Sequence, residues 1–188
     1  FLGAPNLVTL DLSYNKITRL DLRNFKKLTN FTANHNVILA TVLFPDGSTE
    51  LRNIDLSDGD ITHFYPVSLP NLRYLNLANG SLLELELGNN YPELRDVDIT
   101  GNVGITSIDV TQQAKLEKLL IKGTKITELN LINNSELIML DASNTDIAKL
   151  DLSGNKNVTN LELSDSKLSR LDVSNLANLY TINIDNTK

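Results

Sequence analysis

Two short stretches, LIMLDASNT over residues 137–145 and LDLSGNKNV over residues 150–158, decide the fold. In the first, apolar residues occupy the first, fourth and sixth positions, and a small polar residue stands at the ninth. In the second, Leu-x-Leu precedes a polar run that ends at the next apolar residue, Val158. Together they make a unit of 21 residues, and the chain repeats this unit. A fixed period of this kind is the signature of a repeat architecture.

The repeats begin at nearly constant intervals. Their first apolar residues are Leu7, Leu28, Leu51, Leu72, Leu94, Leu116, Leu137, Val158 and Leu179, at intervals of 21, 23, 21, 22, 22, 21, 21 and 21 residues. We therefore predict a single repeat domain over residues 1–188. Phe1 stands where the last core residue of a preceding repeat would stand, and Lys188 follows a repeat without a second half. These ends predict a fragment of a longer protein.

The pattern inside each repeat predicts its backbone. The leading half follows L-x-x-L-x-L-x-x-N, and alternation around L-x-L turns two leucines inward and the residue between them outward. The return half is too short for a helix, and sequences such as ITELNL at 126–131 favour extended backbone. We predict a mainly β, right-handed leucine-rich-repeat solenoid of about nine coils, with short parallel strands and few or no helices. Pro66 cannot donate to a strand ladder, so the third repeat is expected to lack a regular return strand.

The ninth position of the pattern calls for an asparagine that bonds the backbone of the bend between strand and return. Asn15, Asn36 and Asn102 keep this residue. The other six repeats carry Gly59, Gly80, Thr124, Thr145, Ser166 and Thr187. Because threonine and serine satisfy only part of the bend and glycine none of it, we expect a weakened asparagine row.

Composition excludes several classes of function. The net charge of −6 and the isoelectric point near 4.9 argue against nucleic acid or an anionic membrane as partner. No apolar run approaches the length of a membrane span. Without cysteine there are no disulfides, zinc–thiolate sites or cysteine nucleophiles. His35 and His63 have no partners at a recognisable triad spacing, and no phosphate-binding loop is present. We predict no enzyme, no metal and no cofactor.

Three segments resemble a known group. LVTLDLSYNKITRLDL (7–22), LIMLDASNTDIAKLDLSGN (137–155) and VTNLELSDSKLSRLDVSN (158–175) resemble the short-repeat leucine-rich-repeat proteins of bacterial surfaces, the internalins and the adhesins with 21-residue repeats. The resemblance implies a secreted or cell-surface protein that binds a macromolecule through its strand face. One departure is that the ninth position carries no cysteine, which some 21-residue members use.

The first candidate contact on the strand face is basic. Arg52, Arg73 and Arg95 occupy the second position of three consecutive repeats, and Tyr74 stands beside them at the third. Arginine and tyrosine are enriched in binding hot spots. Stacked guanidinium groups repel one another unless acids share their charge, and a purely structural interpretation assigns that role to Asp55, Asp96 and Asp98.

The second candidate contact is apolar. Leu120, Ile138 and Met139 take outward positions, where large apolar groups indicate either a contact site or scattered surface residues. The predicted ligand-binding face therefore comprises Arg52, Arg73, Tyr74, Arg95, Asp55, Asp98, Leu120 and Met139.

The return column carries adjacent acids. Glu86 with Asp109, and Asp151 with Asp172, are weak candidates for calcium, which needs several convergent oxygens. Lys149 and Arg170 precede the second pair by two residues and are expected to neutralise it.

The leading functional hypothesis is a non-enzymatic, extracellular binding module of a bacterial surface protein. It would recognise a protein or a glycan through the strand face, in adhesion or host interaction, without inserting into a membrane. The alternative is a rigid structural spacer that presents other domains.

Overall fold

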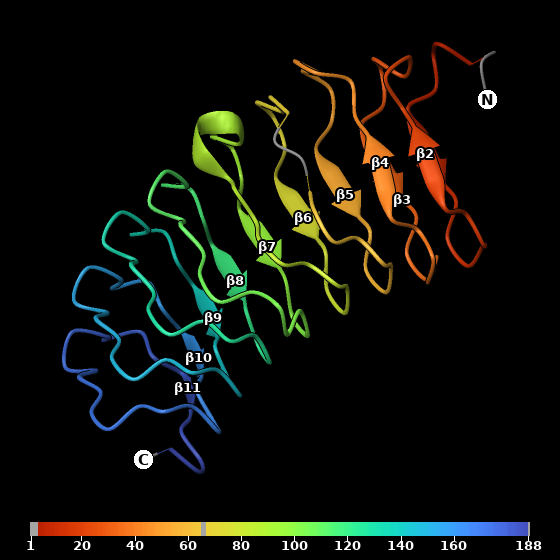
Figure 1. The fold of residues 1–188 in the computed structure, drawn as a ribbon. Coiled ribbons are helices and arrows are strands. Elements are labelled where there is room, and N and C mark those ends of the chain that lie inside the picture. Colours follow the sequence, from red (N-terminus) through yellow and green to blue (C-terminus); the bar gives the residue numbers. More distant parts are fainter. Residues whose placement is uncertain (1–3, 65–66, 188) are drawn as a thin grey trace.

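The computed structural model describes residues 4–64 and 67–187, and it is a stack of coils built on one parallel sheet (Figure 1). In spatial order its strands are β1 (Thr9–Asp11), β3 (Asn30–Thr32), β5 (Asn53–Asp55), β6 (Tyr74–Asn76), β7 (Asp96–Asp98), β8 (Lys118–Leu120), β9 (Met139–Asp141), β10 (Asn160–Glu162) and β11 (Thr181–Asn183). Nine strands in sequence order enclose eight full turns of chain. The one helical element of the described residues is the 3-10 helix η1 (Gly88–Asn90). The predicted mainly β solenoid with parallel strands is confirmed.

The register of the sheet reproduces the repeat intervals of the sequence. Thr9 pairs with Asn30, 21 residues on, and Asn30 pairs with Asn53, 23 residues on. The pairing of Asn53 with Tyr74 returns to 21, and that of Tyr74 with Asp96 spans 22. The inserted residues therefore loop out of the coils without shifting the sheet, since a one-residue slip would turn every core side chain outward.

The middle residue of nearly every strand of the main sheet is buried, while its two neighbours are partly or fully exposed. These middle residues join the return-side leucines and isoleucines in one continuous core. In the first coils an aromatic row adds to it. Ring centroids lie 6.0 Å apart for Phe31 and Phe44, 5.6 Å for Phe44 and Phe64, and 6.3 Å for Phe64 and Tyr91. At the C-terminal end the middle residue Ile182 is 43% exposed.

The return side is regular only at its N-terminal end. There β2 (Arg19–Asp21) pairs in parallel with β4 (Thr41–Leu43). One isolated bridge follows between His63 and Glu84. Further on, the described return segments form no strand, so the strand form of the predicted extended backbone is confined to the first coils. Pro66, on which the prediction for the third repeat rested, lies outside the described residues.

The bend after each strand places one residue in the left-handed region. These residues are Tyr14, His35, Asp58, Asn79, Gly101, Gly123, Asn144, Asp165 and Asn186, the eighth position of each of the nine repeats. Their φ angles lie between 52° and 76°. A left-handed conformation costs an L-residue about 1–2 kcal/mol, and asparagine, aspartate and glycine tolerate it best. Seven of the nine positions carry one of these types, which explains the Asn-Gly and Asp-Gly character of the bends.

Buried amides stabilise the bends in two rows. Asn102 donates through Nδ2 to the carbonyls of Leu77 and Ile99, both at 2.9 Å, and accepts the Leu82 N–H at 3.0 Å. Asn36, nearer the N-terminal end of the stack, makes the equivalent bonds. Where threonine replaces asparagine, as at Thr124, a single bond remains, from Oγ1 to the Ile121 carbonyl at 2.8 Å. The weakened row is therefore as the sequence predicted.

The second row was not predicted. Gln113, Asn134 and Asn155 are buried at the turn that leads from the return side to the next strand, and their amides donate to carbonyls of preceding coils. The signal was present as an amide residue three positions before each following repeat start.

Candidate binding face

The last residue of most strands of the main sheet carries a polar side chain that accepts a backbone N–H of the bend; Leu120 of β8 is an exception. The Ser57 N–H donates to Asp55 Oδ1 at 3.0 Å, and the Thr100 N–H donates to Asp98 Oδ1 at 2.9 Å. Ser57 Oγ also donates to Asp55, at 2.7 Å. The two acids predicted for the binding face are thus held by their own chain, and the Asp-x-Ser/Thr spacing that produces these bonds was visible in the sequence.

Arg52, Arg73 and Arg95 lie side by side immediately before β5, β6 and β7. The Arg73 N–H donates to the Arg52 carbonyl at 2.8 Å, and the Arg95 N–H donates to the Arg73 carbonyl at 2.9 Å. The backbones of the three arginines therefore lie next to one another at the start of three neighbouring strands.

The acids that share this row differ from those expected. Arg95 pairs with Glu117, which occupies the same second position one coil further on, and Arg52 lies 3.8 Å from the Glu50 carboxylate. Asp55, Asp96 and Asp98 make no ion pair with these arginines in the described structure, because their side chains are directed by the bends or paired along the strands. Arg73 is exposed and forms no ion pair with any described residue.

Tyr74 is half-buried beside Arg73, with Asn53 and Asp96 as its neighbours in the register. Burial raises the pKa of its hydroxyl, and the negative charge of Asp55 adds to this. The pKa of the Asp96 carboxyl is also raised, chiefly by burial. The middle of the sheet therefore combines an exposed guanidinium, which makes no ion pair among the described residues but lowers the pKa of Glu93 by its charge, with a half-buried phenol and carboxylate.

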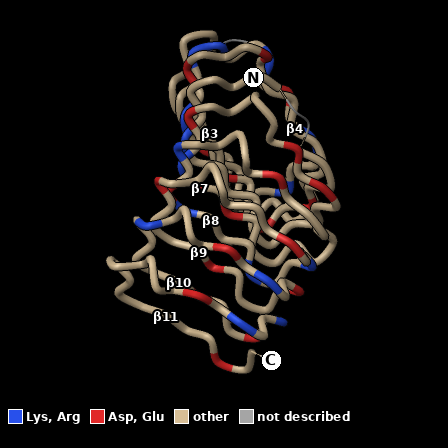
Figure 2. Tube along the Cα trace, turned by 90° about the vertical axis from the view of Figure 1, so that its left-hand side faces the viewer, with Lys and Arg blue, Asp and Glu red and all other residues tan. Residues whose placement is uncertain are grey.

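The apolar residues Leu120 and Met139 are half-buried, and Ile138 is 42% exposed. Leu120 pairs with Asp141, and Met139 pairs with Lys118. Charged side chains therefore interrupt this patch, and it is smaller than its sequence suggested. Figure 2 shows basic and acidic residues interspersed along the coils in this view.

The histidines belong to the bends and the return side. His35 Nδ1 lies 3.3 Å from Asp58 Oδ2, and the Tyr14 ring stacks on it at 4.3 Å. His63 Nδ1 lies 3.0 Å from Thr62 Oγ1. Among the described residues there is no group of three or more histidine or acidic side chains arranged to hold a metal ion. The same residues contain no helix that is long and apolar enough to cross a bilayer.

This architecture, one short parallel strand per coil with asparagine and threonine bends, defines a leucine-rich-repeat solenoid. Solved structures share it. InlJ of Listeria monocytogenes is 25% identical, with a TM-score of 0.64 over 96% of this chain and 44% of that one. Internalin C2 of the same species is 18% identical, with a TM-score of 0.69 over 94% of this chain and 80% of that one. The leucine-rich-repeat domain of APL1B is 21% identical, with a TM-score of 0.82 over 100% of this chain and 56% of that one.

Two further structures of this fold are complexes. The LRIM1/APL1C complex gives a TM-score of 0.80 at 21% identity, covering 97% of this chain and 35% of that one. The TLR13–ssRNA13 complex gives a TM-score of 0.66 at 18% identity, covering 94% of this chain and 32% of that one. Solenoids of this shape thus include binding scaffolds for different partners.

Sequence relatives cover less of this chain than the solved structures do, and no family model matches the chain. Protein PAC2 of Saccharomyces cerevisiae is 24% identical over 135 residues, which are 65% of this chain and 26% of the yeast protein. Putative leucine-rich repeat protein R380 of Acanthamoeba polyphaga mimivirus is 28% identical over 90 residues, 48% and 21% of the two chains. The chain spans about a quarter or less of these relatives and under half of InlJ.

Proposed function

We propose that the chain is a single, non-enzymatic binding domain that holds a protein partner on its strand face, at the centre marked by Arg73 and Tyr74. The observation that carries the proposal is the state of Arg73. Its neighbours Arg52 and Arg95 lie within ion-pair distance of acids, whereas Arg73 is exposed and makes no ion pair within the described structure, although its charge acts on Glu93. A partly desolvated tyrosine beside an exposed arginine is the combination that binding hot spots favour.

The sheet around this centre is suited to a macromolecular contact. The strands are backed by a continuous core, so their outward side chains are held in place before a partner arrives, which lowers the entropy cost of binding. The half-buried Leu120 and Met139 extend the contact on β8 and β9, two and three strands beyond Tyr74.

In our proposal the domain acts outside the cell, at a bacterial surface. Its role there is adhesion or host interaction. Its supports are the internalin-like repeat pattern and the likeness to InlJ. A glycan is the other partner class that we retain, while the charge of −6 disfavours nucleic acid despite the TLR13 likeness. A rigid spacer that binds nothing is the outcome against which the proposal is tested.

The test is a binding screen of the domain against extracellular matrix proteins, mucins and a glycan array, repeated with Arg73→Glu and Tyr74→Ala. We expect at least one protein hit, weakened about tenfold or more by either substitution. Lys156→Glu makes the same charge change at an exposed turn and is the matched control.

A protein hit that is unaffected by both substitutions would contradict the assignment of the site. A domain that is folded by circular dichroism and binds nothing in the screen would favour the spacer. Hits confined to the glycan array would keep the binding role and replace its partner class.

A further inference from the structure

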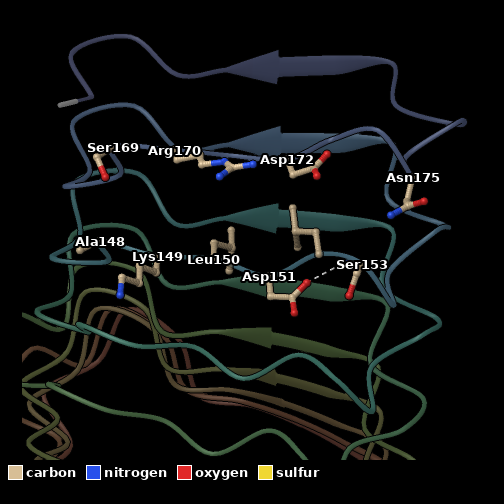
Figure 3. Close-up of a pocket in the computed structure, with 10 residues that line it drawn as sticks. Ala148, Lys149, Leu150, Asp151, Ser153, Ser169, Arg170, Asp172 and Asn175 are labelled. Carbon is tan, nitrogen blue, oxygen red and sulfur yellow. Dashed lines mark hydrogen bonds between the residues drawn. The ribbon is translucent and has the colours of Figure 1, made fainter.

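A cleft with both charged and apolar lining residues opens on the return side of the C-terminal half, away from the strand face (Figure 3). Its volume is about 480 Å³, within the range of ligand sites. Its two walls are the return segments of neighbouring coils, 148–153 and 169–175. Lys149 and Asp151 project from the lower coil of Figure 3, and Arg170 and Asp172 from the upper one.

The four charged groups of this cleft form no ion pair with one another among the described residues. Lys149 and Arg170 were predicted to neutralise Asp151 and Asp172, and the charge of Arg170 does lower the pKa of Asp172, although without a direct ion pair. Each carboxylate instead accepts a backbone N–H at 2.9 Å, from Ser153 and from Ser174. These bonds lower the pKa of both carboxyls, so both are ionised at neutral pH.

The backbone of the cleft is also open. In the first coils the equivalent segments bond to each other as β2 and β4. Between residues 148 and 152, and between 169 and 173, no N–H bonds to a described residue. Two neighbouring segments with free N–H donors can bond an added peptide strand, as in other peptide-binding sites, although the Leu152 and Val173 carbonyls are already engaged by turns.

We propose that this cleft is a second binding site, which takes an extended peptide with an acidic and a basic residue two positions apart. In each wall the cation precedes the carboxylate by two residues, so both project to the same side of an extended chain, about 7 Å apart. A peptide strand with the same i, i+2 spacing places its acid against Lys149 and Arg170 and its base against Asp151 and Asp172. Its backbone pairs with the free groups of the wall.

The probes are fluorescein-labelled peptides, measured by anisotropy with the full 188-residue chain at low ionic strength. TTDVKTT carries the required spacing, and TTVDKTT has the same composition with adjacent charges, which point to opposite sides of a strand. We expect TTDVKTT to bind at least fivefold more tightly, and raised salt to remove the difference.

Two neutralised variants test the assignment of each charge. Lys149→Gln with Arg170→Gln removes the cations, and Asp151→Asn with Asp172→Asn removes the carboxylates but keeps an oxygen for the Ser153 and Ser174 N–H groups. The first variant should no longer distinguish TTDVKTT from TTNVKTT. The second should no longer distinguish TTDVKTT from TTDVQTT. Thermal melts by circular dichroism verify that both variants fold.

Equal affinity of the wild-type chain for TTDVKTT and TTVDKTT, or no binding of either, would overturn the proposal. So would variants that keep the wild-type preferences. Arg73→Glu should leave peptide binding unchanged, because Arg73 lies on the strand face, so failure of this site and failure of the strand-face site are distinguishable.

Discussion

The single residues that shape this solenoid are mostly polar, and they lie in the bends, where they bond the backbone or turn the chain. Aspartates that read as surface charge in the sequence hold the N–H two residues further on, both at strand ends, as in Asp55, and on the return side, as in Asp109. Left-handed residues turn the chain next to them, and buried amides close the bend. Core leucines are interchangeable in kind, whereas each bend residue has a defined partner.

Asn102 is expected to be among the costliest bend residues to replace. Asn102→Ala leaves the buried Leu77 carbonyl and the Leu82 N–H without partners, while the Ile99 carbonyl keeps the backbone N–H of residue 102; each unpartnered group costs about 1–3 kcal/mol. We expect the free energy of unfolding, measured in urea, to fall by about 3 kcal/mol. Asn15→Ala removes the exposed equivalent on the first coil and should cost under about 1 kcal/mol. Equal losses would contradict the role of burial.

Gly101 and Gly123 separate backbone strain from crowding. Both have φ above 70°, but a Cβ on Gly101 would lie 2.6 Å from Asn79 Oδ1, whereas one on Gly123 meets nothing closer than 3.7 Å. We expect Gly123→Ala to cost about 1–2 kcal/mol, for the left-handed backbone alone. Gly101→Ala should cost more, because Asn79 must also move. Thermal denaturation of the two variants provides the comparison, and a smaller loss at position 101 would refute it.

At the scale of elements, the two sides of each coil differ in how they are held. The main sheet runs without a break through nine strands, while the return ladder stops after β2 and β4. Each strand is only three residues long, so a coil is stabilised by its neighbours and by its core side chains more than by its own hydrogen bonds.

Hydrogen exchange followed by NMR should reveal this difference. The Leu22 N–H bonds to Leu43 and the Ala40 N–H to Thr18, so both amides are expected to be protected. The amides of Leu129 and Leu150 occupy the same side of later coils and donate to no described residue. We expect these two to exchange at least tenfold faster. Similar protection in both sets would show that the later return segments are also paired.

The whole molecule is a one-dimensional stack whose core thins at its ends, since Ile182 and Ile184 of the last coil are 43% and 48% exposed. In such a stack stability is the sum of coils and of the interfaces between them. Local opening is therefore expected to start at the exposed coils and to spare the centre.

Acid should destabilise the stack as a whole, because its bend aspartates are spread over the coils. The pKa of each of Asp11, Asp109, Asp151 and Asp172 is lowered, by hydrogen bonds from the serine or threonine two residues on. The pKa of Asp21, whose carboxylate accepts hydrogen bonds from Arg23, is lowered to about 2 from its ordinary value of 3.8. The unfolded chain then binds more protons than the folded one, so these groups stabilise above about pH 4 and lose their effect towards about pH 2.

The urea midpoint should therefore fall between pH 4 and pH 2.5. The drop should shrink in Asp21→Asn, which no longer titrates. Asp96 acts in the opposite direction, because burial raises its pKa, and Asp96→Asn should not reduce the drop. A midpoint that is constant over this range would contradict the role of the aspartates.

The sequence predicted the solenoid because core periodicity is a local signal that each repeat renews. It located Arg73 and Tyr74 on one face by the same counting. It did not predict that Arg95 pairs with Glu117. Asp55 and Asp98, the expected partners, are instead bonded to N–H groups of the bends, and the sequence pattern does not show this. It also missed the cleft beside Arg170, because spacing along one coil does not report how far two return segments stand apart.

The unequal pairing of the two sides has a mechanical consequence. A beam bends most easily where one of its faces can stretch. In coils one and two both faces are bonded, so this end resists flexure, whereas the later coils are fixed along β8 to β11 but can spread on their unpaired face. A pulling force would therefore be taken up first as curvature of the C-terminal half, before any strand of the main sheet separates.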